Sequence, residues 1–276
     1  MKLFNKVAII GVGLIGGSMA LALKKQRLCS QIIGISRHKK TTNLALKIGA
    51  IDKGSQRLDI IKEADLVILA TPVNTILNLA PLIAKIIKPG CIVTDVGSTK
   101  QEVVLKLEKI FPRFVGTHPI AGSEKRGIIN GRADMFKGSL CILTPTKNTD
   151  KEAQRKISIL WNRLGAGVNF LTPATHDKIL SSVSHLPHAL AFSLINTVPK
   201  QYFKFASTGL KDTTRIAASD SELWADILLS NKKNILKTIG SFQKNLSKIK
   251  SAIKKRDGEI LRRILKEAKN KRDSLG

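Results

Sequence analysis

The chain has 276 residues, of which 43% are hydrophobic, and this is enough to bury two modest cores, so two domains are expected. No apolar run reaches the roughly 20 residues that a bilayer crossing needs, and the first residues lead into a strand rather than a signal peptide, which predicts a soluble cytoplasmic protein without a membrane partner. The positive residues that give the net charge of +27 are spread along the chain, with neither aromatic residues to stack on bases nor a nucleic-acid recognition motif. We therefore expect them on solvated helix faces and expect no nucleic-acid partner.

Strands and helices are expected to alternate through the first part of the chain. In order, the patterns predict a strand over 6–10, a helix from 19, a strand over 31–35, a helix over 41–48, a strand over 65–70, a helix over 76–87 and a strand over 91–96. Further strands over 113–116, 139–144 and 167–171 would extend the sheet. This alternation predicts an α/β fold with a Rossmann-type, doubly wound parallel sheet.

The pattern changes at Thr172 and Pro173, because threonine suits a helix N-cap and proline suits the first helical turn. Apolar residues at three- and four-residue spacing then predict helices over 179–198, 223–228, 234–249 and 260–268. We expect a dinucleotide-binding domain over 1–171 and an all-helical domain over 172–276. Such an array could hardly bury all its apolar faces alone, which predicts a homodimer through the helical domain.

Residues 11–16 read Gly-Val-Gly-Leu-Ile-Gly, the GxGxxG fingerprint of dinucleotide-binding proteins. Its glycines allow a tight turn, a close approach of the pyrophosphate and close packing of helix on strand. It follows a strand and opens a helix, a context that favours cofactor binding over the alternative of a purely structural turn. The expected cofactor-binding residues here are Gly11, Gly13, Leu14, Ile15 and Gly16.

The end of the second strand reads Ile35-Ser36-Arg37, where an NAD enzyme would place a carboxylate to bind the ribose hydroxyls. A hydroxyl and a guanidinium at this position suit a 2′-phosphate instead. Ser36 and Arg37 therefore predict NADP as the cofactor, with NAD as the alternative. The other interpretation is a basic surface loop in a very basic protein.

Three further candidates follow strands, at the edge of the sheet where ligands bind. Thr71 and Ser98 are expected to face the nicotinamide and the substrate, and His118 follows the strand over 113–116. A histidine can act as a general base because its pKa lies near the operating pH. The three cysteines are far apart and lack metal-ligand spacing, so neither a disulfide nor a metal site is expected.

Together these features resemble one family. The fingerprint Gly-Val-Gly-Leu-Ile-Gly-Gly-Ser, the loop His-Pro-Ile-Ala-Gly-Ser-Glu over 118–124, and the strings Ser-His-Leu-Pro-His-Ala over 184–189 and Lys-Asp-Thr-Thr-Arg-Ile-Ala over 211–217 resemble prephenate dehydrogenases of tyrosine biosynthesis. The resemblance covers nearly the whole chain, and the last three strings are the specific ones. It implies oxidation of prephenate by hydride transfer to a nicotinamide, with loss of carbon dioxide.

The resemblance also implies roles for individual residues. His118 would be the base, Ser98 would hydrogen-bond and orient it, and Arg215 would bind a substrate carboxylate, unless it forms a helix-surface ion pair with Asp212. The remaining residues implied to line the substrate pocket are Ser123, Ser184 and His188, with Glu124 and Asp212 near its entrance. His176 and His185 are expected to be structural, and Trp224 a core or interface aromatic near the pocket.

Several alternatives stay open from the sequence. In the family that the chain resembles, many prephenate-specific members carry an acidic residue where this chain has Ser36 and Arg37, and this keeps NAD open as the alternative cofactor. The nearest rival activity is that of an arogenate dehydrogenase. A hydroxyacid or imine reductase is a further alternative, but this chain has no evident equivalent of the catalytic lysine that such enzymes use, and the His118 loop would stay unexplained. A non-catalytic NADP-sensing regulator is the alternative from another class of protein.

Overall fold

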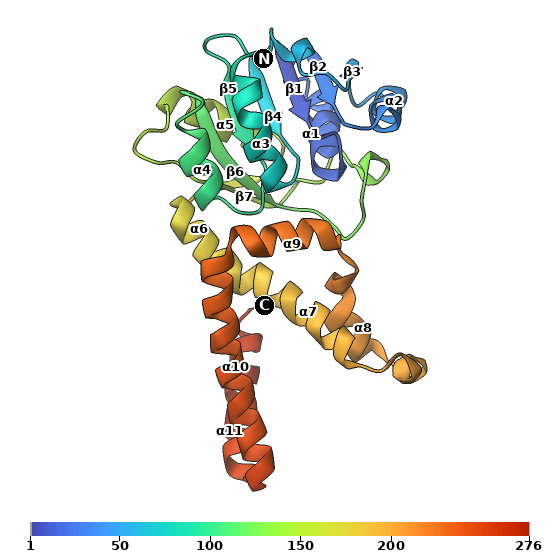
Figure 1. The fold of residues 1–276 in the computed structure, drawn as a ribbon, viewed down its shortest axis with the longest axis vertical. Helices are drawn as coiled ribbons and strands as arrows, with labels where there is room; N and C mark the ends of the chain where they lie inside the picture. Colours follow the sequence, from blue (N-terminus) through green and yellow to red (C-terminus); the bar gives the residue numbers. More distant parts are fainter. Residues whose placement is uncertain (1, 276) are drawn as a thin grey trace. The chain divides into compact units, whose positions relative to one another are not determined.

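The computed structural model describes residues 2–275 (Figure 1). The chain divides into two compact units between Asn231 and Lys232. Among the described residues, no helix combines the length and the apolar character that crossing a membrane requires.

The first unit contains one eight-stranded sheet with the order β3-β2-β1-β4-β5-β6-β7-β8. The strands are β1 (Lys6–Ile10), β2 (Gln31–Ile35), β3 (Lys53–Ser55), β4 (Leu66–Leu69), β5 (Ile92–Asp95), β6 (Phe114–Ile120), β7 (Leu140–Leu143) and β8 (Gly167–Phe170). The predicted doubly wound sheet is therefore confirmed, and the last three strands extend it as expected. The order reverses between β1 and β4, and ligands of open α/β sheets bind at such a switch point.

Strand β6 differs from the prediction in length and in its neighbour. It pairs in parallel with β5 through Phe114 to Gly116, and it then pairs antiparallel with β7, where His118 lies opposite Ile142. The expectation that His118 follows a strand is therefore wrong, because pairing with β7 extends the strand to Ile120. The base candidate stands on a hydrogen-bonded strand and not on a loop.

Helices cover both faces of the sheet. Successive residues of a strand point to opposite sides, and in the central strands both sets are apolar and must be buried. On β1, Val7 and Ile9 belong to one core cluster and Ala8 and Ile10 to the other. The helices are α1 (Leu14–Lys25), α2 (Lys39–Lys47) and α5 (Lys151–Arg163) on the first face, and α3 (Val73–Ala84) and α4 (Gln101–Leu107) on the second. Helix α5, which the sequence analysis did not predict, buries Trp161 against the sheet.

The rest of the first unit is helical. Helix α6 (Pro173–Leu180) starts at Thr172, whose side chain accepts a hydrogen bond from the Thr175 amide, as the N-cap interpretation predicted. The helix predicted over 179–198 is interrupted by a π-helical turn, η3 (Ser181–His185), before α7 (Leu186–Thr197). The following elements are η4 (Lys200–Phe205), α8 (Thr208–Thr214), η5 (Arg215–Ala218) and α9 (Ser221–Ser230). Two single-turn helices, η1 (Asp59–Ile61) and η2 (Ile128–Asn130), lie in the sheet domain's loops.

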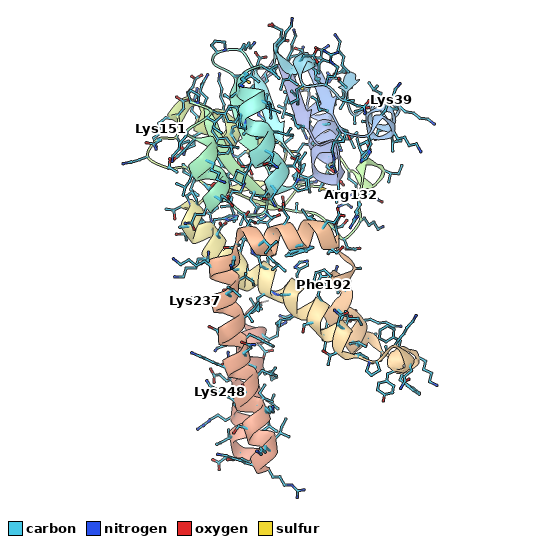
Figure 2. All side chains as sticks on the ribbon, in the orientation of Figure 1. Lys39, Arg132, Lys151, Phe192, Lys237 and Lys248 are labelled. Carbon is cyan, nitrogen blue, oxygen red and sulfur yellow. The ribbon has the colours of Figure 1, made fainter. Side chains whose placement is uncertain are left out.

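The second unit consists of α10 (Lys232–Lys255) and α11 (Gly258–Asp273), which pack on one another. The Asp257 side chain caps α11 by accepting a hydrogen bond from the Ile260 amide. Lysine side chains such as Lys237 and Lys248 project outward from α10 (Figure 2). The strong positive charge here therefore lies on exposed helix faces, as the sequence predicted.

Candidate functional site

A cavity of about 710 Å³ lies within the first unit, at the carboxyl ends of the central strands. Its sheet wall is formed by the glycine turn, Ala70 to Val73, Val96 to Ser98 and the segment from His118 to Gly127. Its helical wall comes from the η3–α7 region, η5 and α9. Most of the sequence-predicted site residues meet here, since the lining includes Gly13, Leu14, Ile15, Thr71, Ser98, His118, Ser123, Ser184, His188 and Arg215.

The glycine turn has the geometry that a bound dinucleotide requires. A side chain at Gly16 would come within 2.1 Å of the Gly11 carbonyl oxygen, so the helix packs too closely on the turn for any other residue. Gly11 has a positive φ of 100°, which side-chain-bearing residues rarely adopt. A Cβ at Gly13 would instead meet open space, where a pyrophosphate can approach the backbone at the start of α1.

Thr71 adds an independent sign of a missing partner. Its hydroxyl oxygen is buried and has no hydrogen-bond partner among residues 2–275. Buried polar groups are nearly always satisfied, whether by protein, by an ordered water or by a ligand. Thr71 lines the same cavity as Gly13, so its position fits the predicted contact with a cofactor.

Ser36 and Arg37 stand directly after β2, where the ribose was expected. The Ser36 hydroxyl accepts a hydrogen bond from the His38 amide, and the Arg37 carbonyl accepts one from Gln56. The Arg37 side chain is exposed. Neither residue lines the cavity that contains His118.

His118 is partly buried and lines the cavity from β6. Burial, together with the neighbouring His176 and Lys100, holds the pKa of His118 well below its usual value. The ring is therefore neutral at neutral pH, and a neutral imidazole can accept a proton from a substrate hydroxyl.

The hydrogen bond to His118 does not come from the residue that we expected. His118 Nδ1 lies 2.8 Å from His176 Nε2 on α6, and within the described part of the chain Ser98 forms no hydrogen bond with His118. Ser98 follows β5 and lines the same cavity as His118. His176, which we had interpreted as structural, is fully buried behind the base.

The helical wall presents an imidazole stacked on an indole. Ser184 and His188 lie on one face of the continuing helix, since His188 Nδ1 is 3.0 Å from the Ser184 carbonyl oxygen. The His188 ring stacks on Trp224 of α9 with centroids 3.4 Å apart, which confirms that this tryptophan lies beside the pocket. His185 points away into the protein, where its Nδ1 lies 3.1 Å from the Asn231 amide, and burial lowers its pKa to about 4.

Two ion pairs connect the loop after β6 to the helical wall. Arg215 Nη1 lies 3.5 Å from Glu124 Oε2, and Arg126 Nη2 lies 2.6 Å from Asp220 Oδ2. Arg215 thus pairs across the cavity mouth and not with Asp212, its expected alternative partner on the same helical segment. This pair places a guanidinium at the cavity entrance, where it could bind a carboxylate.

A buried ion pair supports the floor of the site. The Lys100 ammonium group contacts the Asp95 carboxylate and the Thr117 carbonyl oxygen, the latter at 2.8 Å, and both charged side chains are fully buried. Because Thr117 immediately precedes His118, this pair fixes the strand that carries the base. Lys100 was not among the residues predicted for the site, although a lysine five residues after a strand-ending aspartate is a visible signal in the sequence.

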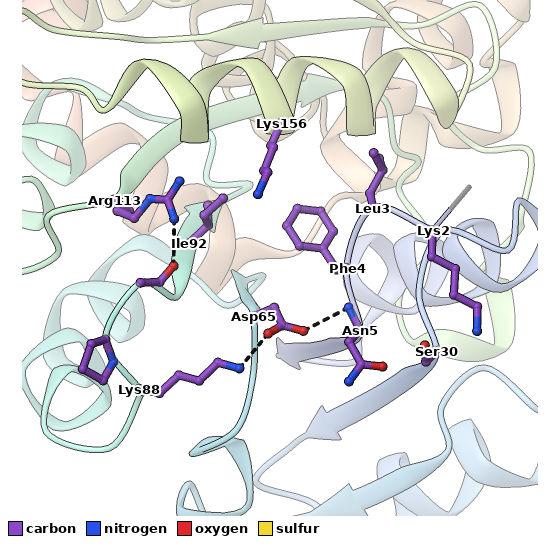
Figure 3. Close-up of a pocket in the computed structure, with 12 residues that line it drawn as sticks. Lys2, Leu3, Phe4, Asn5, Ser30, Asp65, Lys88, Ile92, Arg113 and Lys156 are labelled. Carbon is purple, nitrogen blue, oxygen red and sulfur yellow. Dashed lines mark hydrogen bonds and ion pairs between the residues drawn. The ribbon is translucent and has the colours of Figure 1, made fainter.

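A second cavity, of about 600 Å³, lies at the opposite edge of the sheet, before the starts of β1, β4, β5 and β6 (Figure 3). Three of its four cations are paired with carboxylates, since Lys88 lies 2.7 Å from Asp65 and both Arg113 and Lys156 lie within 3 Å of Glu152. The fourth, Lys2, is exposed. None of the residues predicted for the site lines this cavity. Within residues 2–275, no group of three or more histidine, cysteine or acidic side chains is arranged to hold a metal ion.

Comparisons with known proteins agree on one family. Residues 19–170 match the family model described as "Prephenate dehydrogenase, nucleotide-binding domain", and residues 172–267 match "Prephenate dehydrogenase, dimerization domain". A prephenate dehydrogenase of Bacillus subtilis is 39% identical over 282 residues, which cover 98% of this chain and 76% of the relative.

Solved structures give the same result. The prephenate dehydrogenase from A. aeolicus in complex with hydroxyphenyl propionate and NAD+ superposes with a TM-score of 0.94 at 38% identity, covering 99% of this chain and 98% of that one. Synechocystis arogenate dehydrogenase superposes with a TM-score of 0.83 at 29% identity, covering 98% of this chain and all of the other. The chain belongs to the prephenate dehydrogenase family.

Proposed function

We propose that this chain catalyses the oxidative decarboxylation of prephenate to 4-hydroxyphenylpyruvate, with a nicotinamide dinucleotide as the hydride acceptor. The observation that carries the proposal is the placement of His118 in one cavity with the glycine turn and Arg215. A neutral base, a dinucleotide turn and a cation for a carboxylate are what this reaction requires of a protein.

The reaction balances with His118 as the base. The bound dinucleotide supplies the hydride acceptor, while His118 takes the proton of the ring hydroxyl and a C4 ketone forms. Two ring double bonds link the carboxylate-bearing carbon to that ketone, so the bond to the carboxylate breaks, carbon dioxide leaves and the electron pair passes through the ring to the ketone oxygen. The phenolate that forms then regains the proton from the His118 imidazolium. Aromatisation makes the step effectively irreversible.

The other proposed roles follow from the lining of the cavity. Ser123, Ser184 and His188 are proposed to contact the substrate, and Arg215 is proposed to bind one of its carboxylates. Ser98 is proposed to contact the reacting groups beside His118. The backbone at Gly11, Gly13, Leu14, Ile15 and Gly16 and the Thr71 hydroxyl would hold the dinucleotide.

The preference for NADP over NAD is proposed from the turn after β2. Arg37, His38, Lys39 and Lys40 are all exposed there, and the turn itself contains no carboxylate to repel a 2′-phosphate. The A. aeolicus relative is described with NAD+, which makes NAD the alternative for this chain. Initial rates with each dinucleotide at several concentrations decide between them: a higher kcat/KM with NAD would contradict the proposal.

We further propose a cytoplasmic homodimer through the helical domain, with the domain boundary between residues 171 and 172. The two family models, which adjoin at this point, support the boundary. Large exposed apolar side chains support the dimer, since Phe205 is 76% exposed, Leu229 69% and Ile253 60%. Light scattering of the purified protein should give twice the chain mass of 30.1 kDa, and the mass of one chain would refute the dimer.

The rival substrate is arogenate, the amino acid analogue of prephenate, since an arogenate dehydrogenase also superposes on this chain. Purified protein should be assayed with prephenate and with arogenate, each with NAD and with NADP, by the absorbance of the reduced cofactor. We expect the highest kcat/KM with prephenate. A preference for arogenate would favour the rival, and turnover of neither would favour a dinucleotide-binding regulator.

A further inference from the structure

A chain of three side chains runs from the cavity into the protein interior. His118 Nδ1 lies 2.8 Å from His176 Nε2, and His176 Nδ1 lies 2.8 Å from Asp177 Oδ1. His176 and Asp177 are buried and do not line the cavity, so they are behind the base and not beside the substrate. The hydrogen bonds cross from β6 of the sheet to α6 of the helical region.

The direction of each hydrogen bond follows from Asp177. Its carboxylate accepts the backbone amides of Lys100 and Gln101 at 2.8 and 2.9 Å, at the start of α4. Both of its oxygens thus act as acceptors, so His176 donates from Nδ1. Its Nε2 then carries a lone pair and accepts the proton on His118 Nδ1.

This order leaves His118 with its proton on Nδ1 and its lone pair on Nε2. The lone pair is then on the nitrogen that remains for the cavity, because His176 occupies the other. Were the tautomers reversed, His118 would present an N–H to the substrate and could not act as a base.

We propose that His176 and Asp177 form a positioning pair that selects the Nδ1–H tautomer of His118 and so leaves the Nε2 lone pair free to take the substrate proton. The expected effect of this pair on kcat rests on the proposed function. The tautomer itself does not depend on that function and can be measured without substrate.

The charges around the pair are consistent with this role. The Lys100 ammonium group is paired with Asp95, and His185 is directed to Asn231. Asp177 is the carboxylate that hydrogen-bonds to the His176 ring. Burial lowers the pKa of His176, although Asp177 opposes this effect, so His176 remains neutral and keeps its accepting lone pair at neutral pH.

The direct test is the protonation of the histidine ring nitrogens, measured by ¹⁵N NMR on the substrate-free protein at pH 7.5. The chain contains only five histidines, so single replacements can assign the signals. We expect His118 to be protonated at Nδ1 and unprotonated at Nε2. A proton on Nε2 of His118, or a charged ring, would overturn the proposal whatever the enzyme's activity.

The kinetic test compares His176→Gln with His176→Leu. The glutamine amide can still accept a hydrogen bond from His118, whereas leucine cannot. We expect His176→Gln to retain kcat within tenfold and the Nδ1–H tautomer of His118. His176→Leu should lose the tautomer preference and lower kcat roughly 10- to 100-fold, less than the loss of the base itself, with the substrate KM within about threefold.

Lys178→Ala provides the matched control, since Lys178 is exposed on the same helix, and it should behave as wild type. Equal kcat values and equal His118 tautomers in the glutamine and leucine variants would refute the positioning role. If the leucine variant fails to fold, the wild-type and glutamine spectra still decide the question. A wild type that turns over neither substrate but shows the expected tautomer would refute the proposed function and leave the hydrogen-bond chain in place.

Discussion

Replacing Lys100 by methionine removes the cation from a fully buried pair and keeps most of the side chain's volume. The Asp95 carboxylate would then retain only its contacts with the amides of Gly97 and Thr117, at 2.8 and 3.3 Å. Breaking a buried ion pair on one side costs about 3–5 kcal/mol, because an uncompensated charge is left in the interior. We therefore expect Lys100→Met to lower the free energy of unfolding by about 3–5 kcal/mol at pH 7.

Urea unfolding at one fixed protein concentration, followed by circular dichroism, measures this loss. Lys106→Met is the control, because Lys106 forms an exposed pair with Glu102 on the same helix, and such pairs contribute about 0.3–0.5 kcal/mol. The double variant Asp95→Asn with Lys100→Met should recover part of the loss, since no bare charge remains. A cost below about 1 kcal/mol for Lys100→Met would show that the interior solvates Asp95 without its partner, and would refute the reasoning.

The remaining predictions concern the site. His118→Asn should lower kcat by roughly two to four orders of magnitude, because the general base is lost, while the dinucleotide affinity in a fluorescence titration stays nearly unchanged. Turnover within tenfold of wild type would refute the assignment of His118 as the base. Arg215→Ala should raise the substrate KM in steady-state assays by a factor equivalent to about 1.5–3 kcal/mol, the contribution of a hydrogen bond to a charged group, and an unchanged KM would leave Arg215 as the partner of Glu124 only. Ser36→Asp should shift the kcat/KM ratio toward NAD by at least about tenfold, or about 1.4 kcal/mol, because the new carboxylate repels a 2′-phosphate; equal weakening of both cofactors would contradict this.

The parts of the fold that were predictable are those in which the residue pattern repeats locally. Strand β2 has the predicted bounds of residues 31–35, because its buried apolar residues are flanked by polar ones. Strand β3 (Lys53–Ser55) was missed because it is short, polar and half exposed at the sheet edge. The π-helical turn over 181–185 was also missed, since an apolar spacing of three and four residues does not distinguish a continuous helix from one with a local widening.

The candidate site also contains one part that could be predicted from the sequence and one part that could not. The glycine turn could be predicted because three glycines at fixed spacing have one common explanation. The partner of His118 could not, because His176 lies 58 residues further along the chain and nothing local to either residue indicates the contact. Ser98 was favoured because it also follows a strand at the same edge, but proximity at an edge does not establish a hydrogen bond. A buried histidine adjacent to an aspartate in sequence, as at 176 and 177, was the signal that could have been used.

The long sequence separations around Asp177 bear on the order in which the protein folds. Asp177 accepts amides 76 and 77 residues away, and Asp226 of α9 accepts the Asn74 amide across 152 residues. Contacts that close such long loops form late, because the chain loses the entropy of closing the loop before the contact contributes its stabilising energy. The β1–β4 pairing spans 59 residues, from Val7 to Leu66, and the anchoring of Asp177 to the start of α4 spans 76 and 77. The sheet that holds the dinucleotide turn can therefore form before Asp177 is anchored, so a partly folded chain would bind a dinucleotide before the pair behind the base is in place.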